Sequence, residues 1–221
     1  MEDRLTPGLY LELGDISPSD YGRTRAPELL ARPGVDRVSW WATTIPGRTE
    51  LPMAVPDGTL LGVAETTDAF AVPDPPPNTT ARYFRRYPRP GQGILTGRPT
   101  TGLLVVWISP ITPDRAQPLR DWADFIHIRQ IAAAAVPGYT QITPYENPAG
   151  TDPRFMHLYE MDSNDPEATF QTMAEDLQVR LGGYKTPEFK QWADWTAAGA
   201  EIIYVNTFRL LGSAGPVGST D

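Results

Sequence analysis

The spacing of apolar residues predicts alternating strands and helices in the C-terminal half of the chain. Residues 103–108 form a continuous apolar run, which is typical of a strand buried on both faces. Residues 114–135 carry apolar side chains at helical intervals, and the Pro137-Gly138 pair that follows is a helix stop signal. Segments 139–145 and 154–161 have the character of strands, and the loop of turn-forming residues between them predicts a hairpin.

Two further helices and a strand are predicted beyond this hairpin. One helix begins at Asp165-Pro166 and ends at Gly182-Gly183, because glycine readily adopts the left-handed conformation that ends a helix. A shorter helix follows Thr186-Pro187, and residues 201–208 form a last strand. The order is therefore β-α-β-β-α-β with one added helix.

The N-terminal half repeats this order less completely. Residues 8–13 alternate as a strand, residues 21–31 form a helix, and two more strands follow at 35–44 and 59–66. Segment 71–78 cannot be helical, because prolines remove hydrogen-bond donors and clash with the preceding turn. We therefore expect this half to have lost its second helix. The expected domains are an N-terminal half (1–100), a C-terminal half (101–211) and a disordered tail (212–221), with residues 88–101 joining the halves.

Composition limits the class of protein. The 221 residues are 40% hydrophobic and 21% charged, as in globular proteins. No apolar run approaches the roughly 18 residues of a membrane span, and the first residues lack a secretory pattern, so we expect a cytoplasmic protein that does not enter membranes. The chain has no cysteine, which excludes disulfides and a thiol nucleophile.

A net charge of −8 argues against nucleic acid as a partner, since binding a phosphate backbone rewards clustered lysine and arginine. Residues 82–89 do interleave arginine with aromatic residues, as some binders of single strands do. The same alternation describes an edge strand with a solvated arginine face, and we favour that interpretation.

The chain has two histidines, His127 on a predicted helix and His157 on a predicted strand. Histidine has the unperturbed pKa nearest neutrality, so the pair suggests proton transfer. Asp124 precedes His127 by three residues, and on an α-helix its carboxylate can reach the imidazole and orient it. A purely structural interpretation stays open, in which Asp124 is solvated at the helix surface and His127 covers the sheet edge.

Strand periodicity places Phe155, His157 and Tyr159 on one sheet face and Met156 and Leu158 on the other. We expect the apolar pair to pack on the helices and the first set to face a cavity. His157 as a hydrogen-bonded core residue is an equally good interpretation. No spacing of ligand residues singles out a metal site.

Three stretches carry a resemblance to a known family: Trp122-x-Asp124-x-x-His127, Pro137-Gly138-Tyr139, and residues 154–160 with the pattern Arg-Phe-x-x-Leu-Tyr-Glu. They resemble the dimeric α+β barrel superfamily, most closely the branch related to EthD. That resemblance implies an α+β fold in which two ferredoxin-like β-α-β-β-α-β halves of one chain close as a pseudo-twofold barrel around a small-molecule cavity. The chain departs from the family pattern beside His127, where Ile126 precedes and Ile128-Arg129 follows.

The resemblance implies a cofactor-independent lyase, isomerase or cyclase that acts on a small aromatic or polyketide-like molecule. His127 would be the general base or acid, Asp124 would orient it, and His157 or Tyr159 would hold a developing oxyanion. The expected substrate-binding residues are aromatic: Trp122, Tyr139, Phe155, Tyr159, Trp107 and Trp40.

Two alternatives remain open at this point. One is a haem-dependent oxygenase or peroxidase with His127 or His157 as the iron ligand. The other is a non-catalytic stress protein that binds a small molecule. Either a monomer or a homodimer is compatible with a barrel built from one chain.

Overall fold

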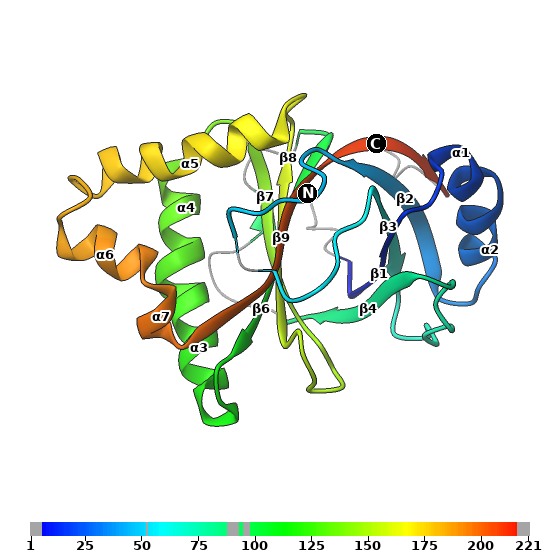
Figure 1. Ribbon diagram of the computed structural model, residues 1–221, viewed down its shortest axis with the longest axis horizontal. Helices are drawn as coiled ribbons and strands as arrows, with labels where there is room; N and C mark the ends of the chain where they lie inside the picture. The colour runs from blue at the N-terminus through cyan, green and yellow to red at the C-terminus, as the bar shows by residue number, and fades with distance from the viewer. Residues whose placement is uncertain (1–5, 52, 88–92, 95–97, 216–221) are drawn as a thin grey trace.

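Eight antiparallel strands close into a barrel in the computed structural model of the chain, which describes residues 6–51, 53–87, 93–94 and 98–215 (Figure 1). The order around the barrel is β4-β1-β3-β2-β9-β6-β8-β7, and β7 pairs back with β4. The barrel strands are β1 (Gly8–Gly14), β2 (Val35–Thr43), β3 (Leu60–Thr66), β4 (Thr79–Arg86), β6 (Gly102–Pro110), β7 (Tyr139–Glu146), β8 (Phe155–Met161) and β9 (Ala200–Ala214). A short strand, β5 (Gly93–Ile94), adds to β7.

Two pairings between the N-terminal and C-terminal strands close the barrel. β2 pairs with β9, for example Trp41 opposite Leu210, and β4 pairs with β7 through Arg85 and Arg86. Because β4 also pairs with β1 along its length, it is not an edge strand, and our expectation for residues 82–89 was wrong on that point. Residues 88–89 lie outside the described residues. Because the barrel is closed, few backbone N–H and C=O groups of its strands lack a partner strand.

Helices cover the outside of the barrel on two opposite sides (Figure 1). Those of the N-terminal half are α1 (Pro18–Asp20), the π-helical turn η1 (Tyr21–Arg25) and α2 (Ala26–Leu30). Those of the C-terminal half are η2 (Pro113–Arg115), α3 (Ala116–Trp122), the π-helical turn η3 (Ala123–His127), α4 (Ile128–Ala134), α5 (Pro166–Arg180), α6 (Pro187–Ala193) and α7 (Trp195–Ala198).

Side-chain caps fix where the later helices begin. The Asp165 carboxylate accepts a hydrogen bond from the Ala168 amide at 3.0 Å, and the Thr186 hydroxyl accepts one from the Phe189 amide at 3.2 Å. These two caps confirm the predicted starts of α5 and α6. Asp194 caps α7 in the same way, a helix that we did not predict.

Large apolar side chains fill the interior of the barrel, and residues from both halves contribute to this cluster. They include Leu11, Leu61, Phe84, Trp107, Met156 and Phe208. Within the described residues the structure therefore shows a packed cluster between the two sheets, where we expected a ligand cavity. Since interiors of proteins pack as densely as organic crystals, this cluster instead holds the two halves together.

The N-terminal half has no helix between β3 and β4, as predicted from its prolines. An extended segment takes that place, and its Phe70 packs between Tyr10 and Tyr83 with ring centroids 5.6 Å apart in each case.

The predicted disordered tail from residue 212 needs a correction, because β9 continues to Ala214 and pairs Gly212 with Trp40. Residues 216–221 lie outside the described residues. The division at residue 100 stays a prediction.

Gly62 of β3 provides a test of this packing. A Cβ atom added there would lie 1.9 Å from the hydroxyl oxygen of Tyr21, which donates a hydrogen bond to Glu12. Gly62→Ala should lower the free energy of unfolding by about 1–3 kcal/mol, measured by guanidinium denaturation. The ring carbon that carries the hydroxyl would lie 2.3 Å away, so only removal of the whole ring relieves the clash. The same change made in a Tyr21→Ala background should cost clearly less, and an equal cost in both backgrounds would contradict this contact.

Candidate functional site

A cavity of about 230 Å³ lies between the helices of the C-terminal half and the outer face of its sheet. Apolar side chains make up most of its wall and include Leu104, Val106, Met173, Ala174, Ile202 and Val205. The polar side chains in the wall are those of His127, Tyr159 and Gln171. The candidate site therefore lies outside the barrel, on the helix-covered side of the sheet.

A backbone carbonyl fixes the tautomer of His127. Nδ1 of the ring lies 3.0 Å from the carbonyl oxygen of Trp192, and since a carbonyl can only accept, Nδ1 must carry the proton. In the neutral ring the lone pair is then on Nε2. The His127 side chain is also one of the residues that line the cavity.

The end of α6 supplies this carbonyl. The last four carbonyl groups of a helix have no partner within the helix. Trp122 Nε1 donates to the carbonyl of Gln191 at 2.8 Å, and His127 Nδ1 donates to the next one along. The chain leaves α6 at Asp194, which begins α7, so both carbonyls stay available. The end of α6 thus holds both side chains in place.

Three tryptophans surround His127. Trp192 stacks on the ring with centroids 5.1 Å apart and planes 1° apart, and Trp122 and Trp195 lie at 4.9 and 4.6 Å. Complete burial disfavours the charged imidazolium and lowers the pKa of His127 to about 4, although the hydrogen bond to Trp192 opposes this shift. At neutral pH His127 is therefore an uncharged base.

Asp124 does not orient His127 as predicted. The structure directs this buried carboxylate toward Tyr87, whose hydroxyl lies 3.5 Å from Oδ1, while His127 bonds to the backbone. The cause is the π-helical turn η3, which contains both residues. A π turn holds more residues than the 3.6 of an α turn, so side chains three apart diverge around the axis.

The face assignment of β8 was reversed. Met156 and Leu158 point into the barrel, whereas Phe155 and Tyr159 belong to the apolar cluster beneath the helices. His157 shares that face, is completely buried, and has no hydrogen-bond partner on either ring nitrogen among the described residues. Burial, and to a lesser degree the neighbouring His127, lower the pKa of His157 to about 3.

The other predicted residues divide into two groups. Tyr159 lines the cavity, and Tyr139 and Phe155 pack in the same cluster. Burial holds the pKa of Tyr159 above its usual value, so its hydroxyl stays protonated and can donate. Trp107 lies inside the barrel, and Trp40 packs beside Tyr21 in the N-terminal half, so the structure does not bring either to the site.

Sequence reasoning missed Trp195 and the role of Trp192. A usable signal was present, because three of the six tryptophans of the chain occupy positions 122, 192 and 195 on helices. Within the described residues no group of three or more histidines, aspartates or glutamates could hold a metal ion. No helix among them is long and apolar enough to cross a membrane.

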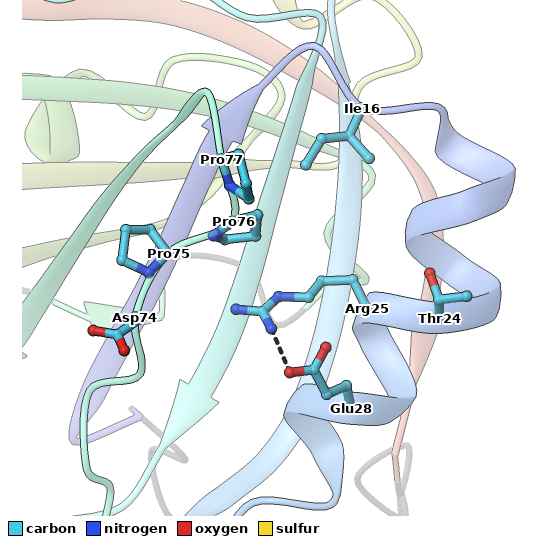
Figure 2. Close-up of a pocket in the computed structure, with 8 residues that line it drawn as sticks. All are labelled: Ile16, Thr24, Arg25, Glu28, Asp74, Pro75, Pro76 and Pro77. Carbon is cyan, nitrogen blue, oxygen red and sulfur yellow. Dashed lines mark hydrogen bonds and ion pairs between the residues drawn. The ribbon is translucent and has the colours of Figure 1, made fainter.

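A second hollow, of about 400 Å³, lies on the N-terminal half between α2 and the proline-rich segment (Figure 2). Its most buried polar group is Arg25, which forms ion pairs with Glu12 at 2.5 Å and with Glu28 at 2.7 Å. The carboxylates therefore satisfy this guanidinium, and the hollow offers no comparable reactive group.

No family model matches the sequence, and no curated protein matches it. Solved structures share its fold. An anthrone oxidase-like protein is 12% identical, with a TM-score of 0.51 over 94% of this chain and 92% of that one. A major regulator of staphylococcal pathogenesis is 9% identical, with a TM-score of 0.53 over 92% and 99%. A variant chlorite dismutase from Candidatus Nitrospira defluvii is 9% identical, with a TM-score of 0.51 over 94% and 93%.

At these identities the likeness shows the fold alone. The chain has the α+β fold of ferredoxin-like barrel proteins, which the predicted fold class named. Both enzymes and a regulator have this fold, so the function must be argued from the site.

The two buried histidines predict how stability depends on pH. Below pH 6.5 the unfolded chain binds a proton on each histidine, while the folded chain does not until about pH 4 for His127 and about pH 3 for His157. Stability contributed by these groups is therefore lost as the pH falls from 6.5. Between pH 7.5 and 5, His157→Leu should reduce the fall in unfolding free energy by about 2 kcal/mol, measured by urea denaturation.

Two buried carboxylates contribute to stability with the opposite dependence on pH. Burial raises the pKa of Glu65 and Glu160, so their contribution to stability grows as the pH falls. Both groups are present in the wild-type chain and in the variant, and their effect cancels in the difference. If the unfolding free energy falls equally in the wild type and in His157→Leu between pH 7.5 and 5, His157 binds protons in the folded state.

Proposed function

We propose that the chain is an enzyme that removes a proton from a small, largely apolar substrate, with His127 as the general base. The observation that carries this proposal is the hydrogen bond from Nδ1 to the Trp192 carbonyl, which leaves the lone pair of the neutral ring on Nε2 in a side chain that lines the cavity. A base fixed in one tautomer and one orientation needs no reorganisation before proton transfer.

The cavity also suggests where the negative charge would go. The Tyr159 side chain lines the same cavity and its hydroxyl stays protonated, so we infer that it donates to an oxygen that gains charge as the proton leaves. Apolar walls exclude water and strengthen this interaction. A planar substrate with one carbonyl or hydroxyl group would match the wall best.

Many lyases, isomerases and cyclases begin by removing a proton, and we infer a cofactor-independent reaction of this kind. The motif around Trp122 supports a place in the EthD-related branch, and the same order of strand pairing in both halves supports a tandem repeat with pseudo-twofold symmetry. The anthrone oxidase-like protein shares the fold and suggests anthrone as a test substrate.

A haem fits this site poorly. His127 has the right donor, since a neutral imidazole held through Nδ1 can bind iron through Nε2. The cavity of about 230 Å³ is, however, smaller than the ~300–1,000 Å³ that drug-sized ligands occupy, and a haem is larger still. None of the described side chains that line the cavity is a lysine or arginine that could pair with propionates.

Exchange of carbon-bound hydrogen tests the proposed base directly. In oxygen-free D2O the wild-type chain should accelerate deuterium incorporation into the methylene group of anthrone, followed by proton NMR. His127→Asn should lower the enzymatic rate by about 100-fold or more, because the amide can still donate to Trp192 but has no basic nitrogen. The wild-type rate should stay level from pH 8 to 5, since His127 ionises at about pH 4.

Two outcomes would contradict the proposal. Equal rates in the wild-type chain and His127→Asn would exclude His127 as the base. Tight binding of anthrone by the wild-type chain without any exchange would favour a non-catalytic binding protein. Thermal melting of the variant shows whether its fold is intact.

A further inference from the structure

The cavity of the C-terminal half is completed by a residue from the N-terminal half. Of the residues that form its wall in the described part of the chain, Leu51 alone precedes residue 100. It lies between β2 and β3 and packs against the apolar cluster beneath the C-terminal helices. Segment 44–51 therefore reaches from one half to the site of the other.

A buried arginine holds this segment in place. The Arg48 side chain is 0% exposed and forms ion pairs with Glu167 in the first turn of α5 and with Glu50. Its Nε donates to Asn206 on β9 at 3.4 Å, and its guanidinium carbon lies 5.7 Å from the centre of the Phe170 ring. Phe170 is itself part of the cavity wall.

Further hydrogen bonds attach the first residue of the segment, and Ala54 three residues beyond Leu51, to β9. The Thr44 amide donates to the Thr207 carbonyl at 2.9 Å, and the Ala54 amide donates to the Ile203 carbonyl at 2.9 Å. Glu167 is also fixed from β9, because it accepts a hydrogen bond from the Thr207 hydroxyl at 2.6 Å. Leu51 is thus placed by contacts to two elements that line the cavity.

We propose that Leu51 determines the size of ligand that the cavity accepts, and that Arg48 is the residue that positions it. This inference rests on the proposed function, since it concerns the substrate of the same cavity. A burial as complete as that of Arg48 is costly unless its partners are well placed, which explains why three polar groups converge on it. The substrate class is a weakly polar, planar molecule whose length is limited by Leu51.

Binding of two aromatic alcohols of different size tests the role of Leu51. Quenching of tryptophan fluorescence gives the Kd of 2-naphthol and of the larger 9-phenanthrol for the full chain, because three tryptophans surround His127. Leu51→Ala should favour 9-phenanthrol over 2-naphthol by about tenfold or more relative to the wild type. Leu51→Trp should shift the preference the other way. Leu211→Ala, a matched change at a leucine outside the wall, should leave it unchanged.

The role of Arg48 is tested by a double-mutant cycle with the same two probes. Arg48→Met should shift the preference in the same direction as Leu51→Ala, and the double variant should add little further, because both changes act on one wall. If Arg48→Met does not fold, Glu167→Gln removes the partner charge with a smaller change. Additive shifts, or no shift for either variant, would assign Arg48 a structural role only and overturn its part of the proposal.

The outcomes also separate this inference from the proposed function. If the probes bind and Leu51→Ala leaves the ratio of their Kd values within twofold of the wild type, the size role of Leu51 is wrong while the site stands. If the wild-type chain binds neither probe, the cavity is not an aromatic-binding site, and both proposals fail.

Discussion

The hydrogen bond between His127 Nδ1 and the Trp192 carbonyl is the interaction on which the site depends. It determines which ring nitrogen carries the proton and therefore which nitrogen has the free lone pair. The bond exists because α6 ends just before Asp194 and leaves its last carbonyl groups unpaired. The barrel supplies the rigid surface beneath: its packed interior fixes β6, β8 and β9, whose outer faces form the floor of the cavity.

The two halves use the same position in different ways. Each has a π-helical turn in the helical segment between its first two strands, η1 in one half and η3 in the other. In the N-terminal half Tyr21 and Arg25 of this turn reach Glu12 and fill the space with polar contacts, for which Gly62 leaves room. In the C-terminal half the turn instead delivers His127 to a cavity. Such turns are frequent at functional sites, in agreement with the proposed role of His127.

The sequence predicted the order of elements because their signals are local. Prolines, glycines and capping residues mark where helices begin and end, and the caps at Asp165 and Thr186 form as expected. It could not settle which face of β8 meets the helices, since both faces are buried and alternation distinguishes two faces without orienting them. The prediction that Asp124 pairs with His127 was wrong, because the π turn that separates the two side chains has no clear sequence signal. The contribution of Leu51 depends on a contact between residues that are far apart in the chain, which local patterns do not contain.

The nitrogen-15 NMR spectrum of the His127 ring in the folded chain tests the proposed tautomer most directly. At neutral pH we expect a neutral ring with the proton on Nδ1 and the chemical shift of a free lone pair on Nε2. We also expect the ring to stay neutral on acidification until about pH 4. A proton on Nε2, or titration near the usual value of 6.5, would contradict these expectations.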